Sequence, residues 1–82
     1  AFAYRAHPRW LAVRRELPSL GGPLTAHAAF CFHAPQKPRL LDPVGGGALM
    51  DVGCYPLSWL ISLLGAPESV ACNARLAATG VD

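Results

Sequence analysis

Charged side chains are scarce in this chain, and this narrows the range of partners expected for it. Its 82 residues are 15% charged and 52% hydrophobic, with a formal net charge of +2. Arg9, Arg14 and Arg15 lie close together, but no basic stripe with interleaved aromatic residues accompanies them. Nucleic acid is therefore not expected as a partner. A short chain this apolar is expected to place part of its surface against protein outside it.

Cysteine pairs and metal-ligand spacings are also missing. Cys31, Cys54 and Cys72 are odd in number, show no CxxC spacing and lie in apolar runs, which is typical of free thiols in a reducing compartment. His27, Cys31 and His33 would share one face of a strand, but strand residues four apart are separated by about 13 Å. His27 and Cys31 are then too far apart for one tetrahedral ion, so no metal site is expected.

The sequence contains no secretory signal and no run long enough to span a membrane. The longest apolar stretch, 52–64, is interrupted and falls short of the roughly 20 residues that a span needs. We therefore expect a cytoplasmic protein with no membrane partner. The chain starts at Ala1 without an initiator methionine and stops at Asp82 with no element completed. Residues 1–82 are accordingly expected to be a fragment of a longer protein, or a chain with partners.

Hydrophobic periodicity predicts an α+β fold. Residues 24–33 alternate between two faces and are bounded by turn residues, which is typical of a strand. Pro8 is expected to open a helix and Pro18 to end it, before a turn at Gly21-Gly22. The resulting order of strand, helix, strand, helix and strand predicts a layer of helices on a sheet. The expected elements are strands at 2–5, 24–33 and 68–76, helices at 8–17 and 48–64, and a proline-rich loop at 34–44.

The predicted helix 48–64 carries one narrow polar stripe on an otherwise apolar surface. Asp51, Tyr55, Ser58 and Ser62 fall within an arc of about 60° on a helical wheel. This pattern predicts a largely buried helix whose stripe faces water or a polar cleft. Two interpretations stay open at this point: a thin solvated edge, or a site lined by Asp51 and Tyr55. Pro56 predicts a kink or bulge just after Tyr55.

Glycines precede this helix, and two charged or polar residues lie near the start of the chain. Gly45-Gly46-Gly47 matches neither a GxGxxG fingerprint nor a Walker loop, so it is either a flexible connector or a close approach of backbone to a ligand. Arg5 and His7 lie where the first strand is expected to pass into a helix. That position is common for site residues, and surface solvation is the alternative.

Two motifs resemble a known family. Ala3-Tyr4-Arg5-Ala6-His7-Pro8 resembles its YR-x-HP step, and the segment from Gly45 to Pro56 resembles its GGGAL-x-D-x-G-x-Y signature. The family is the glucose–fructose oxidoreductase, inositol dehydrogenase and MocA family of NAD(P)-dependent oxidoreductases. The tyrosine at the last motif position is similar to the dihydrodiol dehydrogenase and xylose dehydrogenase branch.

The resemblance implies a partial C-terminal α/β domain, with helices on a mostly antiparallel sheet and with the Rossmann domain absent. It implies hydride transfer between a nicotinamide cofactor and a sugar, polyol or diol. Tyr55 would be the catalytic acid/base, and Asp51, also catalytic, would orient the substrate hydroxyl or the family's catalytic lysine. His7 would join both in binding the substrate. Arg5 would bind NAD or NADP, held mainly by the absent Rossmann domain. Lys37 does not match the catalytic lysine of the family's EKP segment, which the chain lacks.

Three functional hypotheses remain open from the sequence. The first is a fragment of an NAD(P)-dependent oxidoreductase, which alone should not turn over substrate and which would pair with a second copy through the face of its sheet. The second is a non-catalytic relative that serves in binding or dimerisation. The third is a stand-alone interaction domain.

Overall fold

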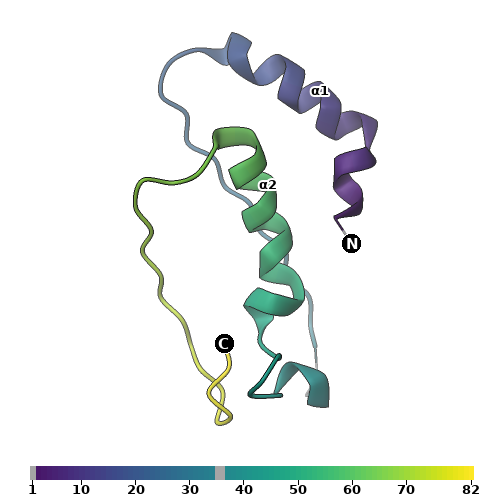
Figure 1. The fold of residues 1–82 in the computed structure, drawn as a ribbon, viewed down its shortest axis with the longest axis vertical. Helices are drawn as coiled ribbons and strands as arrows, with labels where there is room; N and C mark the ends of the chain where they lie inside the picture. The colour runs from purple at the N-terminus through teal and green to yellow at the C-terminus, as the bar shows by residue number, and fades with distance from the viewer. Residues whose placement is uncertain (1, 35–36) are drawn as a thin grey trace.

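The computed structural model describes residues 2–34 and 37–82, in which two α-helices are joined by short turns and long extended segments (Figure 1). Pro35 and Gln36 of the predicted proline-rich loop lie outside the described residues. The elements are the 3₁₀ turns η1 (Ala3–Ala6), η2 (Leu17–Leu20) and η3 (Pro38–Leu40), the π-helical turn η4 (Leu49–Gly53), and the helices α1 (Pro8–Glu16) and α2 (Cys54–Leu64).

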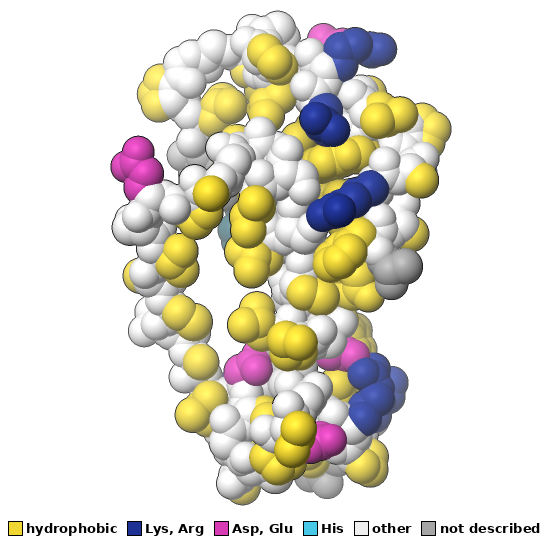
Figure 2. All heavy atoms as spheres, viewed as in Figure 1, with side chains coloured by type: hydrophobic (Ala, Val, Ile, Leu, Met, Phe, Trp, Pro, Cys, Tyr) yellow, Lys and Arg dark blue, Asp and Glu magenta, His cyan; other side chains and the backbone are white. Residues whose placement is uncertain are grey.

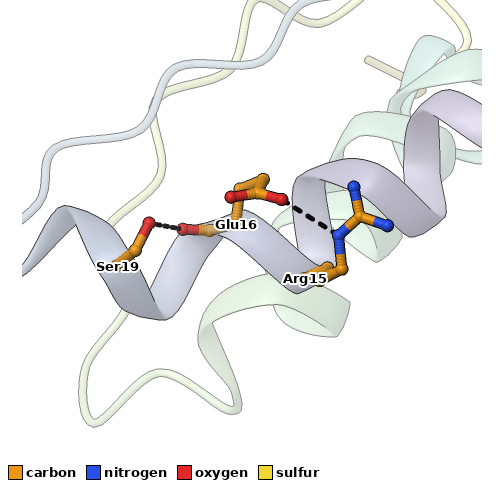
Figure 3. A network of polar contacts seen from close by, with 3 residues as sticks. All are labelled: Arg15, Glu16 and Ser19. Carbon is orange, nitrogen blue, oxygen red and sulfur yellow. Dashed lines mark hydrogen bonds and ion pairs between the residues drawn. The ribbon is translucent and has the colours of Figure 1, made fainter.

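Helix α1 forms where the sequence predicts it. Pro8 occupies its first turn, and the backbone N–H of Arg9 donates to Nδ1 of His7 over 3.1 Å, which caps the helix. At the other end, the Ser19 hydroxyl donates to the carbonyl of Glu16 over 2.6 Å, and Nε of Arg15 donates to Oε1 of Glu16 over 2.9 Å (Figure 3). These bonds carry the helix into η2, after which Gly21 and Gly22, with φ of 62° and 64°, turn the chain as predicted.

The predicted helix 48–64 is present, but its distortion precedes Tyr55 instead of following it. The N–H of Cys54 donates to the carbonyl of Leu49, five residues back, which is the π-helical pattern of η4. The regular helix α2 begins only at Cys54, so Pro56 falls within its first turn. The distortion lies in η4, ahead of Pro56, and α2 continues without a break beyond Tyr55.

The prediction of an α+β fold with helices on a sheet is wrong for the described residues, which contain no strand. Segments 24–33 and 68–76 run extended (Figure 1) but lie against different faces of α2. Strand status requires a neighbour that pairs with each backbone N–H and carbonyl. Alternation of apolar and polar residues distinguishes the two faces of one segment, but it does not show whether a second segment pairs with it. The sheet face expected to join two copies therefore has no counterpart in residues 2–34 and 37–82.

The predicted strand end at 2–5 is also wrong, because local hydrogen bonds replace strand pairing there. The N–H of Arg5 donates to the carbonyl of Phe2 over 3.1 Å, and that of His7 donates to the carbonyl of Tyr4 over 3.0 Å. These contacts, each three residues long, wind the segment into η1. The turn brings Tyr4 and Arg5 alongside α2.

Aromatic rings form the centre of the structure, between α1 and α2. Trp10 is 5% exposed and is the one buried hydrophobic residue in the described part of the chain. Its ring lies 5.1 Å from that of Tyr4 and 5.5 Å from that of Trp59, centroid to centroid. Such ring pairs add about 0.5–1.5 kcal/mol each beyond the area that they bury. This cluster fixes the N-terminal segment against the helix that carries Tyr55.

The expectation that helix 48–64 is largely buried is wrong for the described residues. Leu57, Ile61 and Leu64 of α2 are 49%, 42% and 50% exposed, and Figure 2 shows hydrophobic side chains across the visible face. Within the polar stripe, Ser58 meets the N-terminal segment, where its hydroxyl contacts the Tyr4 hydroxyl and accepts a hydrogen bond from Arg5. The radius of gyration is 15.5 Å, compared with about 12 Å for a compact chain of this length. The extended segment 66–82 lies partly away from α2, which contributes to this larger radius (Figure 2).

Candidate functional site

The structure brings Asp51 and Tyr55 together on one open groove of about 620 Å³. Asp51 lies in η4 and Tyr55 in the first turn of α2, so the junction of the two elements forms one wall. Tyr4 from η1 and Phe30 and Phe32 from the extended segment contribute further lining. The wheel prediction that Asp51 and Tyr55 share a face therefore corresponds to a shared groove.

Asp51 is held by a basic partner that the sequence analysis did not identify. Its side chain is 13% exposed, and its Oδ1 accepts a hydrogen bond and ion pair from Nη1 of Arg39. Arg39 belongs to η3 and is 65% exposed, so its guanidinium reaches from solvent into the groove. Carboxylate oxygens are hydrogen-bond acceptors, and one of the two oxygens of Asp51 remains outside the contact with Arg39. Asp51 can therefore accept hydrogen bonds from hydroxyl groups in the groove.

The glycine run builds the turn that places Arg39 beside Asp51. The N–H of Gly46 donates to the carbonyl of Asp42 over 2.7 Å, and that of Gly47 donates to the carbonyl of Leu40 over 2.8 Å. A Cβ on Gly46 would lie 2.5 Å from the carbonyl oxygen of Leu40, and Gly47 has φ of +97°. Only glycine fits both positions without strain. The run is thus a tight turn of defined shape, which argues against a flexible connector.

The helix N-terminus after this turn is already occupied by the chain itself. The N–H of Ala48 donates to the backbone oxygen of Asp82 over 3.1 Å, and that of Leu49 donates to Oδ2 of Asp82 over 2.5 Å. A carboxylate at a helix N-terminus satisfies free N–H groups and interacts favourably with the helix dipole. Asp82 takes the place at which the sequence analysis considered a ligand.

Tyr55 is half-buried and positioned by aromatic contacts. Its ring centroid lies 5.4 Å from that of Phe2, in a T-shaped arrangement, and 5.9 Å from that of Phe30. These contacts come from two segments far apart in the sequence and fix the ring at the groove wall. A change of Tyr55 to phenylalanine would retain the ring contacts and remove only the hydroxyl.

Tyr4, which the sequence analysis did not assign to the site, is held by a polar network. Its hydroxyl lies 2.8 Å from Oγ of Ser58, and Nη2 of Arg5 donates to the same Oγ over 2.8 Å. Nε of Arg5 lies 3.4 Å from the Tyr4 hydroxyl. The network joins η1 to α2. The only sequence signal for Tyr4 was its place in the YR-x-HP step, and the polar stripe had identified Ser58.

The pKa of Tyr4 reflects two opposing effects. Desolvation raises this pKa, but the hydrogen bonds with Ser58, Arg5 and Ser62 and the charge of Arg5 together outweigh desolvation. The pKa of Tyr4 is therefore lowered from its ordinary value of 10.0. Hydrogen bonds and positive charge stabilise the phenolate, which makes Tyr4 a group able to exchange a proton at the groove.

Arg5 and His7 occupy different positions from Asp51 and Tyr55. The guanidinium of Arg5 lies 5.0 Å from the centroid of the Phe2 ring and is joined to the site through Ser58 and Tyr4. His7 caps α1 and lines a separate groove of about 410 Å³ beside Trp10. The structure thus connects Arg5 to the site and places His7 outside the Asp51–Tyr55 groove.

Two further features follow from the described residues. Neither α1 nor α2 is long and apolar enough to cross a membrane. In residues 2–34 and 37–82, no three side chains among His, Cys, Asp and Glu come together in a way that could hold a metal ion.

The family is established by comparison with known proteins. Residues 16–82 match the family described as GFO/IDH/MocA C-terminal domain. The chain therefore belongs to this family, and the resemblance read from its two motifs is confirmed. No solved structure matches the chain.

The similar proteins are named as oxidoreductases and dehydrogenases. The uncharacterized oxidoreductase YgjR of Escherichia coli (strain K12) is 31% identical and matches 100% of this chain and 28% of its own length. D-xylose 1-dehydrogenase (NADP(+)) 2 of Haloferax volcanii is 35% identical over 85% of this chain and 23% of its own length. Trans-1,2-dihydrobenzene-1,2-diol dehydrogenase of Xenopus tropicalis is 33% identical over 100% of this chain and 26% of its own length. The chain spans about a quarter of the length of these relatives.

Proposed function

We propose that this chain supplies one wall of the substrate site in an NAD(P)-dependent oxidoreductase that acts on a hydroxyl carbon of a sugar, polyol or diol. The observation that carries the proposal is the shared groove of Asp51 and Tyr55. It offers a proton-exchanging phenol and a hydrogen-bond-accepting carboxylate to one small molecule. The names of the relatives, a xylose dehydrogenase and a dihydrodiol dehydrogenase, support the same substrate class.

The proposed chemistry assigns separate tasks to the two groups. When an alcohol is oxidised, a hydride leaves its carbon with the electron pair of the C–H bond, and the hydroxyl proton passes to a base. Tyr55 is that base, and it acts as the acid in the reverse direction. Asp51, paired with Arg39, accepts a hydrogen bond from a substrate hydroxyl and so orients the carbon. In the family that the chain resembles, a lysine of the EKP segment would lower the pKa of the tyrosine.

The chemistry of Arg5 fits a cofactor that carries phosphate groups. A guanidinium has five N–H donors, and Arg5 directs Nε and Nη2 at Tyr4 and Ser58, so donors remain for a phosphate oxygen. Its exposed position permits that contact. A nicotinamide cofactor, when bound, accepts or supplies the hydride. His7 uses Nδ1 to cap α1, which leaves Nε2 to meet a substrate group entering from the groove beside Trp10.

A second candidate function is a non-catalytic domain for binding or dimerisation. The exposed apolar side chains of Leu57, Ile61 and Leu64 on α2 favour it, because such surface is suited to contact with protein. The two candidates make different predictions for Tyr55, since a binding domain does not need its hydroxyl.

The test is the change Tyr55→Phe in the full-length enzyme. Removal of a general acid/base lowers turnover by about 10²–10⁴-fold. The phenyl ring retains the contacts with Phe2 and Phe30, so we expect the fold and the Kd for NAD(P)H to be unchanged. Ser69→Ala, a change on the exposed segment beyond α2, is the control and should leave turnover as it is. Unchanged turnover in Tyr55→Phe would remove Tyr55 from the mechanism.

A further inference from the structure

The chain contains two tyrosines, and the structure gives them different surroundings. The Tyr55 ring is positioned by Phe2 and Phe30, whereas the Tyr4 hydroxyl is held at 2.8 Å by Ser58 and approached by Arg5. Ser58 lies one helical turn beyond Tyr55 on α2. The polar stripe of this helix therefore carries one phenol itself and anchors the other.

Tyr4 also lines the groove that contains Asp51 and Tyr55. Phe2 connects the two tyrosines, with its ring centroid 6.3 Å from that of Tyr4 and 5.4 Å from that of Tyr55. A small molecule in this groove thus meets both tyrosine side chains. Geometry therefore makes both tyrosines candidates for proton exchange with the same ligand.

The charges around Tyr4 favour its phenolate. Tyr4 lines three neighbouring grooves. Besides Arg5, the titratable or charged side chains near Tyr4 are those that line these grooves: His7, Arg9, His27, Arg39, Asp51 and Tyr55. Asp51 is the one acidic side chain in this set, and Arg39 neutralises it. Three guanidinium groups are therefore opposed by a single carboxylate that is already paired. This balance agrees with the lowered pKa of Tyr4.

We propose that Tyr4, held by Ser58 and Arg5 at the wall of the Asp51–Tyr55 groove, is a second acid/base group of the same reaction. The inference rests on the proposed function. In the oxidation, the Tyr4 phenolate oxygen forms an O–H bond as the O–H bond of the alcohol breaks. The electron pair of that bond completes the new C=O bond, and the hydride leaves with the C–H pair for an oxidised nicotinamide. An alcohol, an oxidised cofactor and a phenolate thus give a carbonyl compound, a reduced cofactor and a phenol.

The contacts of Tyr4 favour the form in which a phenol accepts a proton. A base acts only in its deprotonated form, and the Ser58 hydroxyl and the Arg5 guanidinium both stabilise the phenolate of Tyr4. Ser58 acts as a positioning residue, because its hydroxyl supports the Tyr4 phenolate.

The first experiment measures ionisation of the two phenols directly and needs no turnover. In the 82-residue chain, Tyr55→Phe leaves Tyr4 as the only tyrosine, and Tyr4→Phe leaves Tyr55. Ultraviolet absorbance of tyrosinate then gives the titration midpoint of each phenol. We expect Ser58→Ala in the Tyr55→Phe background to raise the midpoint of Tyr4, because the variant removes the hydroxyl that supports the Tyr4 phenolate. An unchanged midpoint would overturn the proposal, whatever activity the full-length protein has.

The second experiment measures kcat against pH in the full-length enzyme. We expect Tyr4→Phe to move the alkaline rise to higher pH, because it removes a phenol whose phenolate Ser58 and Arg5 stabilise. Ser58→Ala should move the rise in the same direction and retain the ring contacts of Tyr4, and Ser69→Ala should leave it in place. A wild-type pH profile in both Tyr4→Phe and Ser58→Ala would overturn the role of Tyr4. If the wild-type enzyme itself turns over no alcohol, the proposed function fails, and the titration of Tyr4 with and without Ser58 still decides whether Ser58 stabilises the Tyr4 phenolate.

Discussion

Gly46 offers the sharpest test of how the turn at 40–47 builds the site. The change is Gly46→Ala, and the matched control is Gly45→Ala, one residue earlier in the same glycine run. A Cβ at position 46 would lie 2.5 Å from the carbonyl oxygen of Leu40, 2.6 Å from that of Asp42 and 2.8 Å from the Asp42 nitrogen. All three atoms belong to the backbone, so no flexible side chain can move aside. A Cβ on Gly45 meets nothing within 4 Å.

The expected cost follows from these contacts. Inserting a methyl group into a filled space costs about 1–3 kcal/mol. If the turn opens to relieve the clash, it loses the hydrogen bonds of Gly46 to Asp42 and of Gly47 to Leu40, each contributing about 1 kcal/mol. Alanine also restricts the unfolded chain, which stabilises either variant by about 0.4–1 kcal/mol. We therefore expect Gly46→Ala to lower the free energy of unfolding by about 2 kcal/mol. Gly45→Ala should leave it unchanged or raise it slightly.

The assay is urea denaturation of the chain, followed by the fluorescence of its two tryptophans. Trp10 and Trp59 lie 5.5 Å apart, so their emission reports whether α1 and α2 remain packed. A loss of about 2 kcal/mol is a factor of about 30 in the unfolding equilibrium, well above the scatter of a midpoint measurement. Equal midpoints for the two variants, or a Gly46→Ala midpoint at the wild-type value, would refute the packed turn.

Two further predictions concern the aromatic core and the phenol of Tyr4. Trp10→Ala removes the one buried hydrophobic side chain of the described residues and should lower the free energy of unfolding by about 3–5 kcal/mol. Leu11→Ala, at a position 57% exposed on the same helix, should lower it far less in the same denaturation assay. Similar losses in the two variants would contradict the assigned core. Because the folded-state pKa of Tyr4 lies below its ordinary 10.0, its contribution to stability is complete above that pH and is lost as pH falls through the lowered pKa. Urea midpoints measured from neutral to alkaline pH should show this increase in the wild type and lose it in Tyr4→Phe; an identical pH dependence in both would count against the network.

The helices were predictable because their signals are local. Pro8, with His7 before it, marks the start of α1, and Gly65 follows the end of α2. Helix caps and hydrophobic periodicity act over a few residues, so a single sequence carries them in full. The kink or bulge predicted just after Tyr55 was wrong by a few positions, because the π-helical turn ends at Gly53. Pro56 indicated a distortion but did not say on which side of Tyr55 it would fall.

The strands failed for a physical reason that applies to any isolated segment. The alternation in 24–33 is real, and this segment does bring Phe30 to Tyr55 and Phe32 to the wall of the groove. A sheet, however, depends on hydrogen bonds to a second segment, and the periodicity of one segment does not say whether that partner lies beside it. Here α2 lies beside 24–33 and places its side chains against it.

Two of the four residues of the candidate site, Asp51 and Tyr55, could be predicted from the sequence. Asp51 and Tyr55 lie four residues apart, and their spacing alone placed them on one face. Arg39 and Tyr4 were missed because each reaches the site through a tertiary contact. Arg39 arrives over the turn at Gly46, and Tyr4 meets Ser58 across 54 residues of chain. No periodicity links residues so far apart.

By itself, the sequence determined the two helices, the polar stripe from Asp51 to Ser62, and the family, through motifs whose residues are neighbours in the chain. The tertiary structure alone decided which segments face that stripe, and so which groups meet there. Covalent geometry and capping act within a turn or two, whereas an ion pair or a hydrogen bond between distant residues exists only once the chain has folded. For this reason the pairing of Asp51 with Arg39 and the placing of a second phenol in the groove emerged only from the folded chain.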